Sequence, residues 1–193
     1  MRRASDPTGG FTFVETLVAG GILVVLASMA TLWATGGINL WWTSNTQTDV
    51  RMTTQQAIAR MADELRNATR ASTVLPSPNI VIPPAPNNTS MTFYLPADID
   101  GNGLIVDATG NIEWDMLNPI QYVYDPGTRE ILRLGGGQTV VIAHDVQSAQ
   151  MDDQSTDASL SLNEVRLNVV LQKTTPQQRT VSATSISVVK LRN

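Results

Sequence analysis

A long segment without charge near the N-terminus is the feature that most constrains how this chain can fold. Residues 16–48 contain no Asp, Glu, Lys or Arg, and residues 11–34, FTFVETLVAGGILVVLASMATLWA, are mostly apolar. About 20 apolar residues in a helix, each rising about 1.5 Å, cover the roughly 30 Å hydrocarbon core of a bilayer. The sequence therefore predicts one membrane-spanning helix at residues 11–35.

The flanks of this segment predict its orientation. Arg2 and Arg3 precede it, and because basic residues favour the cytoplasmic side, we expect the following chain to lie outside the cytoplasm. A cleavable signal peptide is the competing interpretation, since residues 27–30 include the small side chains that a cleavage site requires. The apolar character continues past them to Trp33, and this favours a retained anchor.

Composition excludes several classes of function. The 193-residue chain has no cysteine and one histidine, His144, and its net charge is −4. Disulfides, thiolate metal sites and histidine clusters are therefore excluded, and a negative net charge disfavours a nucleic-acid partner. Because no pair of nucleophile and base can be named, we predict that the protein is not an enzyme.

Three residues stand in a fixed order at the start of the apolar segment: Gly10, Phe11 and Glu15, in the sequence GFTFVE. This order, followed by the uncharged segment, resembles the processing site of type IV prepilins and type II secretion pseudopilins. The resemblance implies cleavage after Gly10 and N-methylation of Phe11 by a prepilin peptidase/N-methyltransferase. It also implies that Glu15 acts in filament assembly, by meeting the terminal amine of a neighbouring subunit.

Elementary energetics gives Glu15 two possible roles. A charge costs about 2.5 to 3.5 kcal/mol at the centre of a membrane helix, so a paired amine would reduce that cost and fix the axial register of subunits. Alternatively, Thr12 and Glu15 fit a capping box, in which the glutamate reaches back to a free backbone N–H at the helix start. The two roles are compatible, and the cap alone leaves Gly10 and Phe11 unexplained.

The remaining chain predicts an α+β architecture with four segments. Residues 48–72 place Val50, Ala57, Ile58, Met61, Leu65 and Ala68 on one helix face, with Arg60, Glu64 and Arg66 away from it. Prolines from Pro76 to Pro86 end the helix. Strands are expected at 92–95, 120–124, 130–134, 139–143, 164–172 and 179–191. The predicted segments are a leader (1–10), a transmembrane helix (11–35), a helix extension (36–75) and a β-rich domain (76–193).

The later part of the chain is similar to PilW-like minor pilins and J-type pseudopilins. The similarity rests on TFYLPADIDGNG, IQYVYDPGTREILRL, NEVRLNVVLQ and a terminal VVKLRN, in that order. It implies a pilin-like fold, in which a long helix packs on an antiparallel sheet. It also implies an inner-membrane location before incorporation into a filament, and as partners other pilin or pseudopilin subunits, the prepilin peptidase and an inner-membrane assembly platform.

Residues 98–109, DIDGNGLIVDAT, contain a candidate calcium loop. Asp98, Asp100 and Asn102 alternate as in the first half of such a loop, and Asp107 could replace the glutamate that normally closes it. A plain Asp-Gly turn between two strands is the competing interpretation. Ca²⁺ is the one cofactor for which the sequence offers ligands.

These observations predict a structural subunit, a minor pilin that is processed after Gly10. A pseudopilin of a type II secretion or DNA-uptake machine is an alternative with the same assembly chemistry. An alternative of another class is a membrane-anchored extracytoplasmic domain that binds a ligand. That alternative requires neither Gly10 nor Glu15.

Overall fold

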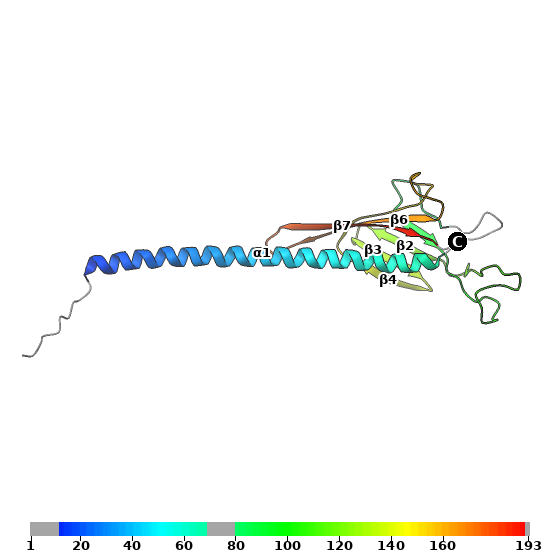
Figure 1. Ribbon diagram of the computed structural model, residues 1–193, viewed down its shortest axis with the longest axis horizontal. Helices are drawn as coiled ribbons and strands as arrows, with labels where there is room; N and C mark the ends of the chain where they lie inside the picture. Colours follow the sequence, from blue (N-terminus) through cyan, green and yellow to red (C-terminus); the bar gives the residue numbers. More distant parts are fainter. Residues whose placement is uncertain (1–11, 69–79, 192–193) are drawn as a thin grey trace, which may run out of the picture. The chain divides into compact units, whose positions relative to one another are not determined.

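A single helix and seven strands make up the described part of the chain. The computed structural model describes residues 12–68 and 80–191, and the chain divides into two compact units between Thr43 and Ser44. Helix α1 (Phe13–Asn67) belongs to both units, and all strands belong to the second (Figure 1). The expected end of the helix extension, with Pro76 and Pro78, lies outside the described residues.

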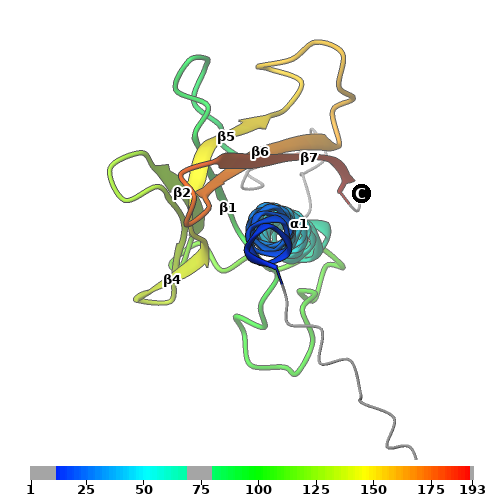
Figure 2. The same ribbon diagram turned by 90° about the vertical axis from the view of Figure 1, so that its left-hand side faces the viewer.

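The second unit contains two antiparallel sheets, and this confirms the predicted α+β class (Figure 2). The first sheet has the order β1-β2-β3-β4, and the second has the order β5-β6-β7. The strands of the first sheet are β1 (Ser90–Phe93), β2 (Ile120–Asp125), β3 (Glu130–Gly135) and β4 (Gln138–Ala143). Those of the second are β5 (Val146–Asp152), β6 (Glu164–Thr174) and β7 (Thr180–Lys190).

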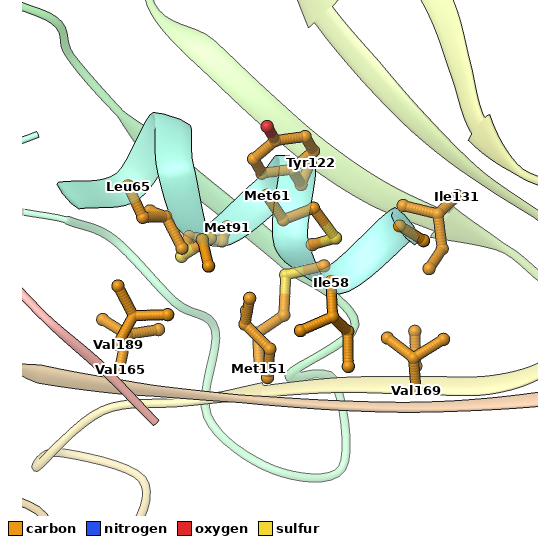
Figure 3. Packing of buried hydrophobic residues seen from close by; sticks show 14 of the residues in the cluster. Ile58, Met61, Leu65, Met91, Tyr122, Ile131, Met151, Val165, Val169 and Val189 are labelled. Atoms are coloured by element: carbon orange, nitrogen blue, oxygen red, sulfur yellow. The ribbon is translucent and has the colours of Figure 1, made fainter. Parts of the chain in front are cut away.

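The core of the second unit is built on one face of α1. The six apolar residues predicted for this face are all buried, and Met61 and Leu65 have no exposed surface. In Figure 3, Ile58 of α1 points toward the side of the cluster that holds Met151 of β5 and Val169 of β6. Spacings of three and four residues bring these side chains to one stripe, so the sheets pack on a helix face that the sequence already defines.

Alternating burial along β6 shows how the second sheet contributes to this core. Its inward residues, Val165, Leu167, Val169 and Leu171, are at most 2% exposed, while their neighbours in sequence are partly exposed. Because successive side chains of a strand point to opposite faces, this pattern leaves the odd-numbered residues against the core. β7 is paired with β6 over its whole length, from Glu164↔Lys190 to Thr174↔Thr180.

The two sheets are joined through β1 and β5. The Met151 backbone N–H donates to the carbonyl oxygen of Asn88 at 2.8 Å, and the Asn88 side chain donates to Asp152 at 2.6 Å. β5 is absent from the strands predicted from sequence. A register shift between Val146 and Ser148 separates the buried Val146 and Ala149 by three residues, and this hides the two-residue period.

Glu64 connects the last turns of α1 to the first sheet. Its carboxylate accepts hydrogen bonds from the Tyr122 hydroxyl and from the Arg133 guanidinium, at 2.9 and 3.0 Å from Nε and 2.5 Å from Nη2. The side chains of Arg133 and Glu64 are only 22% and 19% exposed. The prediction that Glu64 lies away from the buried face was therefore wrong: a carboxylate can be half-buried there because two donors meet it.

This environment shifts the ionisation of Glu64 and Tyr122. Burial raises the pKa of the Glu64 carboxyl. The hydrogen bonds from Arg133 and Tyr122, together with the Arg133 charge, lower this pKa by a larger amount, so the net pKa lies below its ordinary value. Burial, and then the hydrogen bond to Glu64, raise the pKa of Tyr122. A lowered carboxyl pKa contributes stability that is present above the pKa of the unfolded chain and is lost as pH falls through the folded pKa.

We expect Glu64→Gln to lower the free energy of unfolding by about 1 to 3 kcal/mol, because it leaves the half-buried Arg133 without its anion. The matched control is Asp63→Asn on the same turn. Asp63 forms an ion pair with Arg66, and because the two side chains are 73% and 59% exposed, this pair should contribute less than about 1 kcal/mol to stability. Urea unfolding at pH 7 and at pH 3 measures both. Equal stability of the two variants at pH 7, or a Glu64→Gln effect as large at pH 3, would contradict this account.

Candidate functional site

The N-terminal end of α1 is capped by a reciprocal pair of hydrogen bonds. The Thr12 backbone N–H donates to Glu15 Oε2 at 2.9 Å, and the Glu15 backbone N–H donates to Thr12 Oγ1 at 3.3 Å. The Thr12 hydroxyl also donates to Glu15 Oε2 at 2.9 Å. This is the capping box that the sequence allowed. Both hydrogen bonds from Thr12 end on Oε2, so within the described residues Oε1 keeps its capacity to accept a further donor.

The helix that follows the cap is long and apolar enough to span a membrane. It contains an 18-residue window of mean hydropathy 2.1, and none of that window is buried inside the protein. Leu17, Val25 and Leu32, for example, are more than half exposed. The uncovered apolar surface needs either lipid or another apolar partner, because exposing it to water is unfavourable.

Hydroxyl groups inside this apolar segment are bonded within the helix itself. Ser28 donates to the carbonyl oxygen of Val24 at 2.8 Å, and Thr31 donates to that of Ala27 at 2.9 Å. Polar groups in hydrocarbon need an internal partner, so these serine and threonine residues are compatible with an apolar environment. The segment is α-helical through Gly36 and Gly37, although glycine disfavours a helix by about 1 kcal/mol relative to alanine.

The two residues of the predicted processing site, Gly10 and Phe11, lie outside the described residues. The described chain begins one residue later, at the Thr12 cap. The structure therefore places Glu15 at the first turn of α1, and Gly10 and Phe11 stay a prediction from sequence. The predicted cleavage would leave Glu15 within the first turn of the mature helix.

The candidate calcium loop (98–109) and the chain that follows it to Glu113, together called the acidic loop below, bring three carboxylates together, and Glu113 was not predicted. Carboxylate oxygens of Asp98, Asp100 and Glu113 lie within 4.8 Å of one another. Within residues 12–68 and 80–191, these three residues form a group that could hold a metal ion. Asn102 adjoins them, donating from Nδ2 to Asp100 Oδ2 at 2.8 Å. Glu113 is remote in sequence and reaches the loop because its backbone N–H donates to the carbonyl oxygen of Ile105 at 2.9 Å. No spacing rule in the sequence could have found it.

Asp107, the fourth predicted ligand, lies outside this group. Its Oδ1 accepts hydrogen bonds from the Thr109 hydroxyl at 2.7 Å, the Thr109 N–H at 2.8 Å and the Asn111 N–H at 2.9 Å. The Thr109 hydroxyl, followed by the Asn111 N–H, lowers the pKa of Asp107 to about 2. Asp107 is thus part of its own turn, and the structure favours Glu113 in its place.

His144 is the one imidazole of the chain. Its Nδ1 lies 2.7 Å from Glu130 Oε1, and its side chain is 69% exposed. His144 is therefore a surface residue that lies beside a carboxylate.

Comparisons with known proteins found no relative of this chain. A scan against protein-family models matched no family, and neither a search of curated proteins nor a search of solved structures found a match. The geometry described above therefore carries the functional argument.

Calcium binding by the acidic loop stays a prediction, and the structure makes its ligand set testable. Three carboxylates in one loop offer the hard oxygens that Ca²⁺ prefers. If the loop binds Ca²⁺, we expect Ca²⁺ to raise the thermal midpoint. Glu113→Gln should remove that rise, and Asp107→Asn should keep it. Differential scanning fluorimetry with Ca²⁺, and with Mg²⁺ as the control ion, measures this; an unchanged midpoint in the wild-type chain would exclude the site.

Proposed function

We propose that this chain is a structural subunit of a type IV pilus or a related filament, a minor pilin that is processed after Gly10 and N-methylated at Phe11. It would wait in the inner membrane with its β-rich unit outside the cytoplasm. It would then enter a filament, where the apolar helices of neighbouring subunits replace the lipid. Its function would be assembly, with no reaction of its own.

One observation carries this proposal: a single glutamate caps a helix that has no charged residue from 16 to 48 and whose apolar window is not buried inside the protein. An anchor that only held a domain on a membrane could use Glu15 as a helix cap, but it would have no need of the Gly10-Phe11 pair before it. A subunit that leaves the membrane for a filament needs a polar group that fixes its axial position. Glu15, with Oε1 open to a further donor, has the chemistry to accept a neighbouring terminal ammonium.

Two alternatives share some of this support. A pseudopilin of a type II secretion or DNA-uptake machine would use the same processing site and the same helix. A membrane-anchored ligand-binding domain would instead rely on the acidic loop of Asp98, Asp100 and Glu113. The anchored domain makes no use of Gly10 and uses Glu15 at most as a helix cap, so substitutions at these residues distinguish it from a filament subunit.

The first prediction concerns processing. The protein isolated from membranes should begin at N-methylated Phe11, and Gly10→Ala should leave the full leader attached, because Gly10 is the residue after which the resemblance places the cut. Intact-mass spectrometry and N-terminal sequencing measure both. Gly9→Ala is the matched control and should be processed. A wild-type chain that begins at Met1, or that is cut near residues 27–30, would contradict the filament proposal.

The second prediction separates the two roles of Glu15. Glu15→Gln keeps a capping-box side chain and loses the charge, whereas Thr12→Ala loses the capping hydroxyl and keeps the charge. We expect Glu15→Gln to reduce the chain in sheared filaments about tenfold or more, since about 1.4 kcal/mol is enough for that change. Thr12→Ala should reduce it much less.

Quantitative immunoblots of the filament and membrane fractions give this comparison. Both variants should be processed at Gly10 and present in membranes at the wild-type level, so that the readout reports incorporation. The reverse order, with Thr12→Ala excluded from filaments and Glu15→Gln incorporated, would assign Glu15 to capping alone.

A further inference from the structure

The second sheet ends in a long strand with an open side. β7 has eleven residues and is hydrogen-bonded to one neighbouring strand, β6, in the described chain. We call the side of β7 opposite β6 the β7 edge. By comparison, β4 at the end of the other sheet has six residues. A row of unpaired backbone groups at a sheet edge is a template for pairing with another chain.

The pairing with β6 identifies which residues form the β7 edge. The Leu191 N–H donates to the Asn163 carbonyl, and the Thr175 N–H donates to the Arg179 carbonyl, both at 2.8 Å. These two pairs continue the β6–β7 register in both directions, so the odd-numbered residues of β7 form its hydrogen bonds to β6. The backbone groups that point to the β7 edge therefore belong to Ser182, Thr184, Ile186 and Val188.

The β7 edge lacks the devices that normally prevent unwanted pairing. No charged residue or proline occurs between Arg179 and Lys190, although lysine, proline and bulges are the usual protection of an edge strand. Two apolar side chains of the edge residues are open to solvent, Ile186 at 61% and Val188 at 50%. A long, uncharged, apolar edge is a liability in a free protein, and it is suited to a strand that is completed by a partner.

A groove lies beside the β7 edge. A cavity of about 320 Å³ is lined by α1 residues that include Ala59 and Ala62 and by Ser185, Ile186 and Ser187 of β7. The side chains of Ala59, Ala62, Ser185 and Ser187 are small, so they leave space between helix and strand. A strand added at the β7 edge would direct every second side chain toward this space, because side chains alternate along a strand.

A second copy of the chain does not suit the β7 edge. β7 lies along α1 in one direction: Lys173, before the turn into β7, binds Asp49 at 2.8 Å, and Ser187 lines the groove with Arg66. Two-fold antiparallel pairing of β7 with itself would place the Ser44 ends of the two copies at opposite ends of the joined sheet. Such pairing would also bring Arg179 of one copy near Lys190 of the other at each end of the joined strands, and like charges on paired strands are unfavourable.

Charge complementarity describes the occupant. Arg179 and Lys190 place a positive charge at each end of the uncharged stretch. A strand of either direction would therefore find a cation near each of its ends, whereas the charged residues beside the groove between them, Arg66 and Asp63, are already paired with each other at 2.6 Å. An acidic residue at both ends, with uncharged β-branched residues between, is the complementary sequence.

We propose that the β7 edge binds an extended segment of another protein as a fourth strand of the β5-β6-β7 sheet, a segment with uncharged β-branched residues between two acidic ends. Main-chain hydrogen bonds would give affinity, and the groove beside α1 would select its inward side chains. The inference goes beyond the proposed filament function and does not depend on it, because the β7 edge belongs entirely to residues 44–193.

The test uses the full chain in detergent and a capped nine-residue peptide of alternating threonine and valine with aspartate at both ends. Fluorescence anisotropy up to 1 mM peptide gives the affinity, and amide hydrogen exchange locates the site. We expect binding to slow the exchange of the amides of Ser182, Thr184, Ile186 and Val188. The same peptide with lysine at both ends should bind at least tenfold more weakly.

Thr184→Pro is the decisive variant, because it removes an N–H that points to the β7 edge and leaves the bonds to β6 intact. It should weaken binding at least tenfold, and Thr184→Val, which keeps the N–H, should bind within threefold of the wild-type chain. Circular dichroism verifies folding. If Thr184→Pro does not fold, Ile186→Lys replaces it, since this exposed position accepts a charge without loss of core packing and should also weaken binding tenfold.

Three results would overturn the proposal. The first is no peptide binding at 1 mM, and the second is binding that neither variant weakens. The third is slow exchange of the four edge amides in the free chain, which would show that the β7 edge is already covered. Light scattering would then assign the cover to a second copy, if the chain is dimeric, or to a segment of the same chain, if it is monomeric.

Discussion

Burial of one apolar face of α1 between residues 50 and 65 is the constraint on which the second unit depends. Met61 and Leu65 have no exposed surface, and the buried residues of both sheets belong to the same cluster. Hydrophobic contact alone would let a helix rotate or slide against flat strands. The contact of Glu64 with Arg133 and Tyr122 supplies the direction that apolar packing lacks, because charged hydrogen bonds tolerate little displacement.

The helix and strands whose apolar residues repeat at a regular spacing could be predicted from sequence. The face formed by Val50, Ile58, Met61 and Leu65 is buried as its spacing indicated, and β2, β3, β4, β6 and β7 lie where the alternating segments were expected. β5 could not be predicted, because the register shift after Val146 interrupts its period. Glu64 was misplaced for another reason: its partners are 58 and 69 residues away in the chain, and local pattern carries no information about them.

Among the functional residues, too, those that are close in sequence could be predicted and those that meet only through the fold could not. Thr12 and Glu15 are three residues apart, so their capping box could be deduced from spacing. In the acidic loop, Asp98 and Asp100 were found because they are neighbours in sequence, while Glu113 joins them through backbone pairing of Pro96 with Trp114 and of Val106 with Ile112. Asp107 was predicted as a ligand where the structure has Glu113, because a linear motif takes account only of distance along the chain.

The odd-numbered and even-numbered residues of β7 have different surroundings, and this has an evolutionary consequence. Its odd-numbered side chains face the core, and its even-numbered residues carry the outward backbone groups and the exposed side chains. Core packing thus depends on the odd set, and the outward backbone groups belong to the even set, while Ser185 and Ser187 of the odd set also line the groove beside α1. Substitutions in the even set can therefore change what the β7 edge recognises without disturbing the packing of the core. A strand arranged in this way can diverge between lineages faster than the domain that contains it.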